Sequence, residues 1–282
     1  MNSSKTKKIE ILNNSLSLHS MVTAQLVKEL RERTGVGMGD CKNALVETDG
    51  DIEAAIDLLR KKGMAKAAKR AGNETSEGKI KITIEGTDAY IVVVSCETDF
   101  VARNETFEEM LTRFIEIRKA SASDADALAK AEEIKASEYT MKMGENLQIR
   151  TLTKISGEVL ASYVHSNFKN GAIVVAKAGT DADKLKQVAM HVVAASPVVV
   201  SPADIAEEVV AKEKEIQLAM MQQDPKNAGK PADILLKIID GKMNKFREEN
   251  ALITQQFVVN PDQKVKDFIG ADAIVSFERY SI

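Results

Sequence analysis

The sequence has no tryptophan and only two cysteines among its 282 residues. Cys41 and Cys96 lie far apart and form neither a CxxC motif nor a Cys/His ligand spacing, which argues against a disulfide framework and a zinc site. So few cysteines fit a reducing cytoplasm. No apolar run approaches the ~20 residues needed to cross a membrane, so we expect a soluble, cytoplasmic protein without a membrane partner.

Recognisable signatures of catalysis are also missing. His19, His165 and His191 are isolated from one another and have no serine or cysteine partner in a known motif, so we interpret each as a structural or surface histidine. The glycines of residues 35–39 follow no strand, as a dinucleotide-binding loop would, and residues 72–79 do not have P-loop spacing. We therefore expect no catalytic residue, no metal and no cofactor.

The charge balance gives little reason to expect a polyanionic partner. A net charge of -3 provides no overall field that would attract nucleic acid. Residues 60–70 carry six basic residues and no acid, but no aromatic side chain lies among them to stack on a base. We interpret this segment as a solvated linker helix. Direct nucleic-acid binding is a weaker hypothesis, which predicts an affinity that falls steeply with salt.

The length favours two or three modules in an α+β protein. Residues 1–20 are polar and lack the pattern of a secretory signal, so we expect a disordered N-terminal extension. Residues 21–70 predict three helices, with Thr23 and Asp51 as N-caps and with Gly35 and Gly50 as stops. The turn at residues 50–55 resembles ubiquitin-associated (UBA) domains, which are three-helix modules that present a loop to a partner.

Strand and helix patterns then alternate twice. The first set predicts a half-exposed strand at 79–84, a buried strand at 89–95 and a helix at 104–119 capped by Asn104. Short helices follow to about residue 143. The second set predicts strands at 147–155, 158–166 and 172–178 and a helix at 181–195.

The two sets align as an internal repeat with a spacing of 82 residues. This spacing superposes Ile91-Val92-Val93 on Ile173-Val174-Val175 and Thr98-Asp99-Phe100 on Thr180-Asp181-Ala182. Two related αβ subdomains with antiparallel sheets are the simplest interpretation. We assign residues 71–145 to the first, and residues 146–196 with 251–282 to the second.

Residues 197–250 predict an antiparallel coiled-coil hairpin inserted in the second subdomain. On the first arm, one apolar face is predicted from Ile205 through Val209, Lys212, Ile216 and Ala219. The bend is expected at residues 225–231. The second arm returns with Ile234, Leu235, Ile238 and Ile239, and the chain ends with an extended segment at 257–259, a helix at 261–269 and a strand at 273–280.

Residues 96–104, which join the buried strand to the Asn104-capped helix, are predicted to be a loop. Phe100 in this loop has two interpretations: it packs into the core, as most phenylalanines do, or it faces a partner. The repeat has Ala182 at the matching position, although a core role required by the fold would have left a large residue in both copies. This contrast favours an external role for Phe100.

The run Thr98-Asp99-Phe100-Val101-Ala102 resembles the signature of the elongation factor Ts family, whose members are exchange factors for the translational GTPase elongation factor Tu. A second run at residues 30–38, Leu-Arg-Glu-Arg-Thr-Gly-Val-Gly-Met, is also similar to that family. The resemblance continues through residues 143–146, 190–192 and 229–231, and it covers most of residues 21–280.

The resemblance implies that the protein binds GDP-bound elongation factor Tu and releases GDP by displacing Mg²⁺ and its surrounding loops. It assigns that displacement to Thr98, Asp99, Phe100 and Val101. Within the three-helix module it assigns a grip on the nucleotide domain to Arg31, Val36 and Met38. The competing hypothesis is an interaction adaptor that uses the UBA-like module. Whether the protein forms a homodimer is left open.

Overall fold

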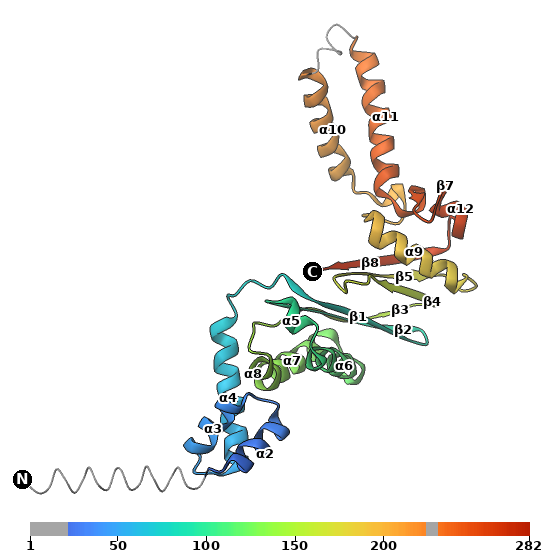
Figure 1. Cartoon of the computed structure of the whole chain (residues 1–282). Coiled ribbons are helices and arrows are strands. Elements are labelled where there is room, and N and C mark those ends of the chain that lie inside the picture. Colours follow the sequence, from blue (N-terminus) through green and yellow to red (C-terminus); the bar gives the residue numbers. More distant parts are fainter. Residues whose placement is uncertain (1–21, 224–230) are drawn as a thin grey trace, which may run out of the picture. The chain divides into compact units, whose positions relative to one another are not determined.

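A computed structural model of the protein describes residues 22–223 and 231–282 (Figure 1). The expected extension at residues 1–20 and most of the bend expected at 225–231 lie outside this range. The described chain mixes helices with small antiparallel sheets, which confirms the α+β class. It divides into two units, one of residues 22–79 and 92–153 with Ile282, the other of residues 80–91, 154–223 and 231–281.

Three helices begin the first unit: α2 (Ala24–Thr34), α3 (Met38–Glu47) and α4 (Ile52–Arg70). The side chains of Thr23 and Asp51 cap α2 and α4 as predicted, and Gly35 ends α2 in a left-handed conformation with φ 69°. The apolar faces enclose one core, made by Val27, Leu30, Val36, Cys41, Ala44, Leu45, Ala55, Leu59 and Met141.

Helix α4 is longer than a three-helix module needs, since it continues without a break through the basic segment 60–70. The linker interpretation treated this segment as a solvated helix, but one side of it is buried. Gly63 is buried where α4 packs against the π-helical turn η1 (Lys135–Tyr139) and α8 (Thr140–Met143). A Cβ on Gly63 would lie only 2.8 Å from Cγ of Met141 and 3.0 Å from the carbonyl oxygen of Ala136, so only glycine permits this close approach.

The strands β1 (Glu77–Glu85), β2 (Asp88–Cys96) and β3 (Gln148–Ser156) form a sheet in the order β1-β2-β3. The sequence pattern placed the strand at 147–155 with the second set of strands, but in the structure it belongs to the first sheet, beside β2. Arg150 of β3 shows the physical reason: its Nε donates to the buried hydroxyl of Ser95 on β2 at 3.0 Å. Buried polar groups need such partners, which hydrophobic periodicity does not reveal.

Helices α5 (Asp99–Ala102), α6 (Glu105–Ala120) and α7 (Asp124–Ile134) follow β2 in the first unit. Asn104 caps α6 through a bond of 2.9 Å from the N–H of Thr106 to its side-chain oxygen, as predicted. The buried face of α6 carries the apolar residues that the helical pattern indicated, Phe107, Met110, Leu111, Phe114 and Ile115.

In the second unit, β4 (Val159–Val164), β5 (Asn170–Ala176) and β8 (Ile274–Ser281) form an antiparallel sheet in the order β4-β5-β8. Helix α9 (Ala182–Ala195) packs against β4 and β5. The core between them includes Val174, Leu185, Val188 and Val192. Four short elements lie between the helical pair described below and β8: η4 (Leu252–Thr254), β6 (Gln256–Phe257), β7 (Asn260–Lys264) and α12 (Val265–Ile269). The helix predicted at 261–269 is thus a strand to residue 264, and helical only afterwards.

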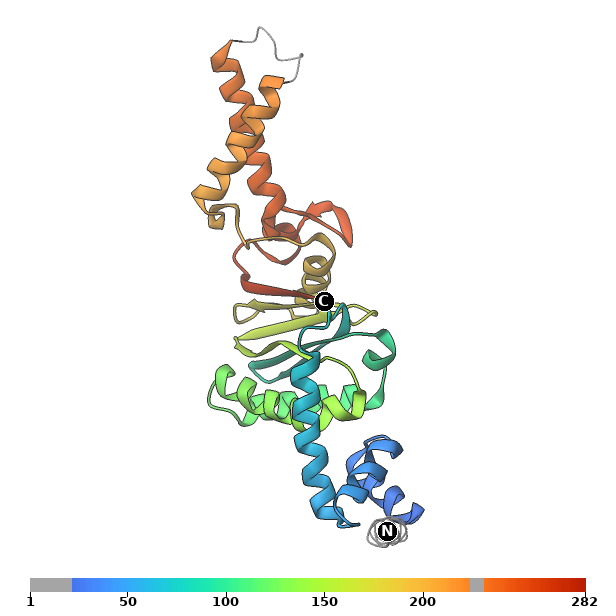
Figure 2. The ribbon, with the colours of Figure 1, turned by 90° about the vertical axis from the view of Figure 1, so that its left-hand side faces the viewer.

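Two helices, α10 (Glu207–Gln223) and α11 (Ala232–Asn250), lie side by side in the second unit (Figures 1 and 2). They run antiparallel, since Glu207 pairs with Arg247 at 2.8 Å and Lys214 with Asp240 at 3.4 Å. No helix in the described ranges combines the length and apolar character that a membrane span requires.

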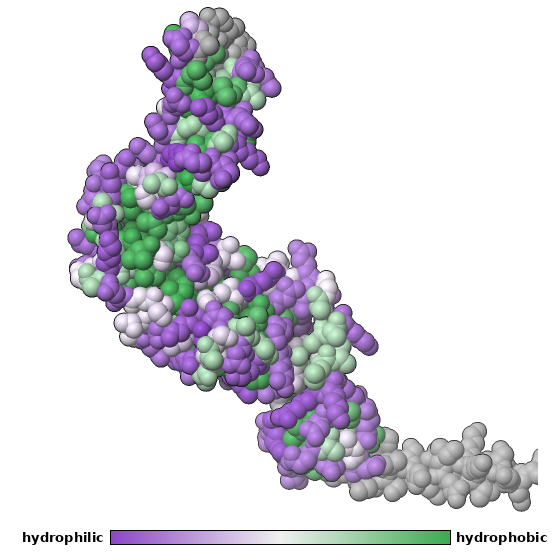
Figure 3. Space-filling view, turned by 180° about the vertical axis from the view of Figure 1, so that it is seen from behind, coloured by the Kyte–Doolittle hydropathy of each residue, from purple (hydrophilic) through white to green (hydrophobic). Residues whose placement is uncertain are grey.

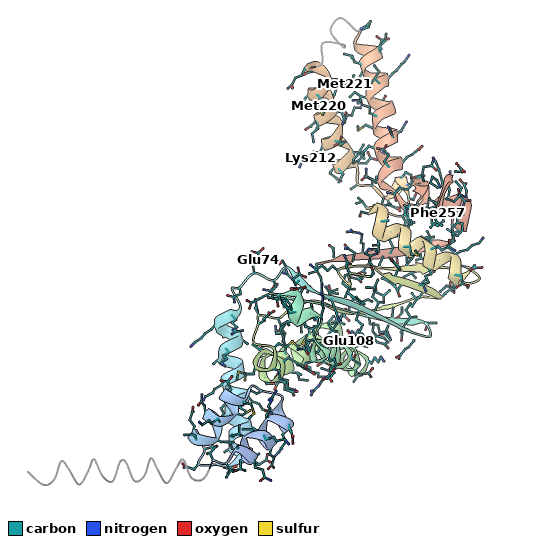
Figure 4. The ribbon with its side chains drawn as sticks, viewed as in Figure 1. Glu74, Glu108, Lys212, Met220, Met221 and Phe257 are labelled. Atoms are coloured by element: carbon teal, nitrogen blue, oxygen red, sulfur yellow. The ribbon has the colours of Figure 1, made fainter. Side chains whose placement is uncertain are left out.

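The predicted contact face of α10 was wrong. Val209 and Ile216 are exposed, and the α10 residues in the shared core with α11 are Val210, Leu218 and Met221. Figure 4 labels Met221 beside its exposed neighbour Met220. The prediction counted the helical period from Ile205, but α10 begins only at Glu207, so the phase was shifted. On α11, Leu235, Ile238 and Ile239 do pack in the seam, while Ile234 is exposed.

Candidate functional site

The segment after β2 contains one turn of helix, α5, where the sequence predicted only a loop. The Thr98 side chain caps this turn by accepting the N–H of Val101 at 3.4 Å, and the N–H of Arg103 donates to the Asp99 carbonyl at 3.0 Å. A side-chain cap satisfies an N–H that a short helix would otherwise leave unpaired. The turn is therefore an ordered element that presents its side chains in defined directions.

Phe100 points away from the protein. Its side chain is 82% exposed, the largest fraction among the large hydrophobic residues that the structure describes. Ala102, two positions on, is buried and anchors the turn. Exposing a phenylalanine to water gives up the roughly 1.5–3 kcal/mol that burial of such a side chain provides. The geometry corresponds to the outward interpretation of Phe100 and not to the core interpretation.

Asp99 and Val101 lie on either side of Phe100. The Asp99 carboxylate is 3.1 Å from Nη2 of Arg103, one helical turn on, and both side chains are well exposed. An exposed i,i+4 pair of this kind is worth only a few tenths of a kcal/mol. The Asp99 carboxylate can therefore leave Arg103 and bind another cation at little cost in free energy. Val101, on the other side of Phe100, is half-buried.

Glu145 holds the start of the turn. Its Oε2 accepts the backbone N–H groups of Glu97 and Thr98, both at 3.0 Å, and its Oε1 accepts the Thr98 hydroxyl at 2.5 Å. Charge-assisted bonds of this type are stronger than neutral ones. Sequence reasoning noted residues 143–146 only as part of a resemblance and missed this function.

Glu97 makes the reciprocal connection. Its Oε1 accepts the N–H of Asn146 at 2.6 Å and the side-chain amide of Asn73 at 3.1 Å. These two hydrogen bonds, in that order, hold the pKa of the Glu97 carboxyl below its usual range. The Asn146 side chain in turn donates to the Asn73 carbonyl at 2.8 Å. Three segments distant in sequence thus meet at the base of the turn.

Cys96 is fully buried at the end of β2, next to this network. Burial, followed by the negative charges of Glu145 and Glu77, raises the pKa of its thiol to about 12. The thiol donates to the Thr98 carbonyl at 3.2 Å. Cys96 therefore remains protonated and supports the backbone on which Thr98 sits.

The repeat copy has no such turn. Asp181 caps α9 by accepting the N–H groups of Asp183 and Lys184, and Ala182 is simply the first residue of that continuous helix. The two helices keep the predicted phase, since Phe107 and Met110 are buried on α6 as Ala189 and Val192 are on α9. The difference between the copies is thus local: in the first copy the helix is interrupted between α5 and α6, and Phe100 is displayed on the turn α5 that precedes the interruption.

The three residues assigned to the module fall into two groups. Arg31 is exposed on α2, and Met38 is exposed at the start of α3. Val36 is only 4% exposed and belongs to the core of the module, so its side chain is not available to a partner. The family-like run at 30–38 contains both core and surface residues. The burial of each side chain in the structure is what distinguishes the two kinds.

His191 has structural surroundings, whereas His165 is exposed. His191 is buried, where its Nδ1 accepts the N–H of Val258 at 3.2 Å and its Nε2 lies 2.9 Å from Oε1 of Gln255. These partners place the proton on Nε2. Burial lowers the pKa of this imidazole. Within residues 22–223 and 231–282, no three His, Cys, Asp or Glu side chains gather in a way that would hold a metal ion.

Comparison with known proteins completes the description of the site. The sequence profile of the family described as "Elongation factor TS" matches residues 97–282, beginning at Glu97. Elongation factor Ts of Ectopseudomonas mendocina is 44% identical over 265 residues, which cover 93% of this chain and 91% of the relative. Those of Ruegeria pomeroyi (44% over 254 residues, 86% of each chain) and Serratia proteamaculans (42% over 265 residues, 93% and 91%) are similar too. The protein therefore belongs to the elongation factor Ts family.

Proposed function

We propose that the protein binds elongation factor Tu in its GDP-bound state and promotes GDP release, after which GTP rebinds. The observation that carries this proposal is the exposure of Phe100 on a turn held by Thr98 and Glu145. Family membership names the class of protein, and this side chain supplies an element that acts by contact alone. No covalent step is needed.

The exchange step follows from the chemistry of nucleotide binding. A GTPase holds GDP largely through phosphate contacts and Mg²⁺, and the loops around the metal have more than one arrangement. Phe100 inserts between elements of the partner and holds them apart, while the Asp99 carboxylate perturbs the electrostatics near the metal. Mg²⁺ and its loops are displaced, and the affinity for GDP falls.

The three-helix module provides a separate grip in this proposal. We regard residues 21–70 as UBA-like, with Arg31 and Met38 contacting the nucleotide domain of the partner. Two of the six basic residues at 60–70 pair with acids of the module, Lys62 with Glu47 at 2.5 Å and Lys66 with Asp40 at 3.3 Å. These pairs reduce the positive charge that this segment could offer to nucleic acid.

The second unit offers an apolar surface suited to another domain of the same partner. A groove of about 420 Å³ is lined by Tyr163, Met190, Val193, Val258 and Val259, among others. Met190, Val258 and Val259 are exposed, and Figure 3 shows apolar residues gathered over this unit below the helical pair. Contiguous exposed apolar surface of this kind is typical of protein interfaces. In the same proposal α10 and α11 form a coiled-coil hairpin inserted in the second subdomain.

The adaptor hypothesis is not favoured, because it assigns no function to Phe100 or to the residues that hold its turn. The proposed function places the protein in the cytoplasm, where translation factors act.

The test is a stopped-flow measurement of fluorescent GDP release from elongation factor Tu. The wild-type protein should accelerate release, and an Asp99→Ala/Phe100→Ala double variant with an unchanged melting temperature should not. Release by the double variant at the wild-type rate contradicts the proposed mechanism. An Arg103→Ala variant, which removes the charge partner of Asp99 but keeps Phe100, is the matched control.

A further inference from the structure

Glu145 reaches the displayed turn only through other residues, and its three hydrogen bonds have a consequence for exchange. We propose that Glu145 is a positioning residue: it fixes Thr98, the cap of α5, and so holds Phe100 and Asp99 in the orientation that inserts into the partner. This inference rests on the proposed function and assigns a role to a residue outside the exposed turn.

The geometry makes Glu145 the residue on which the cap depends. One carboxylate oxygen accepts two consecutive backbone N–H groups, at Glu97 and Thr98, and the other accepts the Thr98 hydroxyl. That same hydroxyl oxygen accepts the N–H of Val101. Because the Thr98 hydroxyl donates its hydrogen to Glu145, the lone pairs of its oxygen face the helical turn. An N-cap side chain needs this orientation in order to accept a backbone N–H.

Glu145 is itself held in place by the backbone around it. Gly144 ends α8 in a left-handed conformation with φ 73°, which reverses the chain so that Glu145 follows the helix directly. On its other side, the N–H of the buried Asn146 donates to Glu97. The carboxylates of Glu97 and Glu145 thus bind each other's segments, and both segments are fixed in register.

Order at the turn matters because Phe100 has little else to hold it. Its side chain is exposed, so the protein's own packing does not select its direction. A side chain that is already oriented loses less conformational entropy on insertion than one on a disordered loop. Such preorganisation should stabilise the strained complex from which GDP is released more than it stabilises the initial encounter complex. The three-helix module also contributes to the initial encounter.

The experiment compares Glu145→Ala and Glu145→Gln with the wild-type protein. Glu145→Ala removes all three acceptors, whereas Glu145→Gln keeps a carbonyl oxygen that accepts the two N–H groups. Glu116→Ala is the control, since it removes an exposed carboxylate that pairs with Lys119 on α6. The first measurement is amide hydrogen exchange at Glu97 and Thr98 in the free protein, and the second is GDP release as a function of protein concentration.

Glu145→Ala should accelerate exchange of these amides by about tenfold or more and lower the maximal rate of GDP release by roughly tenfold, with less than about a twofold change in the half-saturating concentration. Glu145→Gln should restore only part of the rate, because its carbonyl oxygen can still accept the two N–H groups but its NH₂ cannot accept the Thr98 hydroxyl. Glu116→Ala should change neither measurement. Unchanged amide exchange, or faster amide exchange with an unchanged maximal release rate, overturns the inference. So does a fall in melting temperature as the only effect.

Phe100→Ala measured in parallel separates this inference from the proposed function. If Phe100→Ala slows GDP release and Glu145→Ala does not, the positioning role is wrong and the proposed function stands. If neither variant slows release, the proposed function is wrong as well.

Discussion

Phe100 and Ala102 lie two residues apart on the single turn α5 and face opposite environments: Phe100 is 82% exposed and Ala102 only 5%. The turn is thus anchored by its smallest apolar side chain and displays its largest. Stability and partner contact are thereby assigned to different residues, and mutation can separate them.

Phe100→Ala should change the free energy of unfolding by no more than about 0.5 kcal/mol, because no core cavity is left. It should slow GDP release by a factor of tens, which corresponds to about 2 kcal/mol lost from the strained complex. Phe107→Ala is the contrasting control: Phe107 is fully buried, so that change should cost about 3–5 kcal/mol of stability. Urea denaturation and stopped-flow release measure the two effects. A large stability loss in Phe100→Ala would show that its exposure is not retained in solution.

GDP should dissociate the complex of this protein with elongation factor Tu. If the protein lowers the affinity of the GTPase for GDP by some factor, GDP lowers the affinity for the protein by the same factor. Titration of a preformed complex with GDP, followed by fluorescence anisotropy, checks this expectation. Binding that is indifferent to GDP is incompatible with an exchange factor.

Gly63→Ala should destabilise the first unit by about 1–3 kcal/mol, since the added Cβ meets Met141 and the Ala136 carbonyl. Gly241→Ala in α11 is the matched control, because no atom outside its own helix and chain neighbours lies within 4 Å of its added Cβ. There the greater helix propensity of alanine should raise stability by roughly 0.5–1 kcal/mol. Equal effects at the two positions would disprove the close packing of α4 on η1 and α8.

The second unit should lose stability as the pH falls below about 6.5, the ordinary pKa of a histidine side chain. Burial lowers the pKa of His191 in the folded protein, so the unfolded chain binds the proton more readily in this range. The stability that neutral His191 contributes is fully present above the pKa of this histidine in the unfolded chain. It is lost as the pH falls towards the lower pKa of His191 in the folded protein. Urea midpoints between pH 8 and pH 5 should show a smaller decrease for His191→Met than for the wild-type protein. An unchanged pH dependence in the variant would assign the effect to other groups.

Local sequence alone determined most of the helices. Thr23, Asp51 and Asn104 each cap a helix at the predicted position, because a cap needs only a side-chain oxygen and the N–H groups two or three residues on. The internal repeat could also be recognised from the sequence, since residues 82 positions apart keep the same helical phase. Both properties depend on neighbours along the chain or on simple periodicity.

Tertiary structure decided what depends on distant partners. The place of β3 beside β2, the burial of Val36 and the face with which α10 packs were not encoded in any local pattern. The site shows the same division: sequence singled out Asp99 and Phe100, but not Glu145, 47 residues from the Thr98 hydroxyl that it binds. A carboxylate carries no periodic signal, and its function exists only once the fold brings donor and acceptor within hydrogen-bond distance.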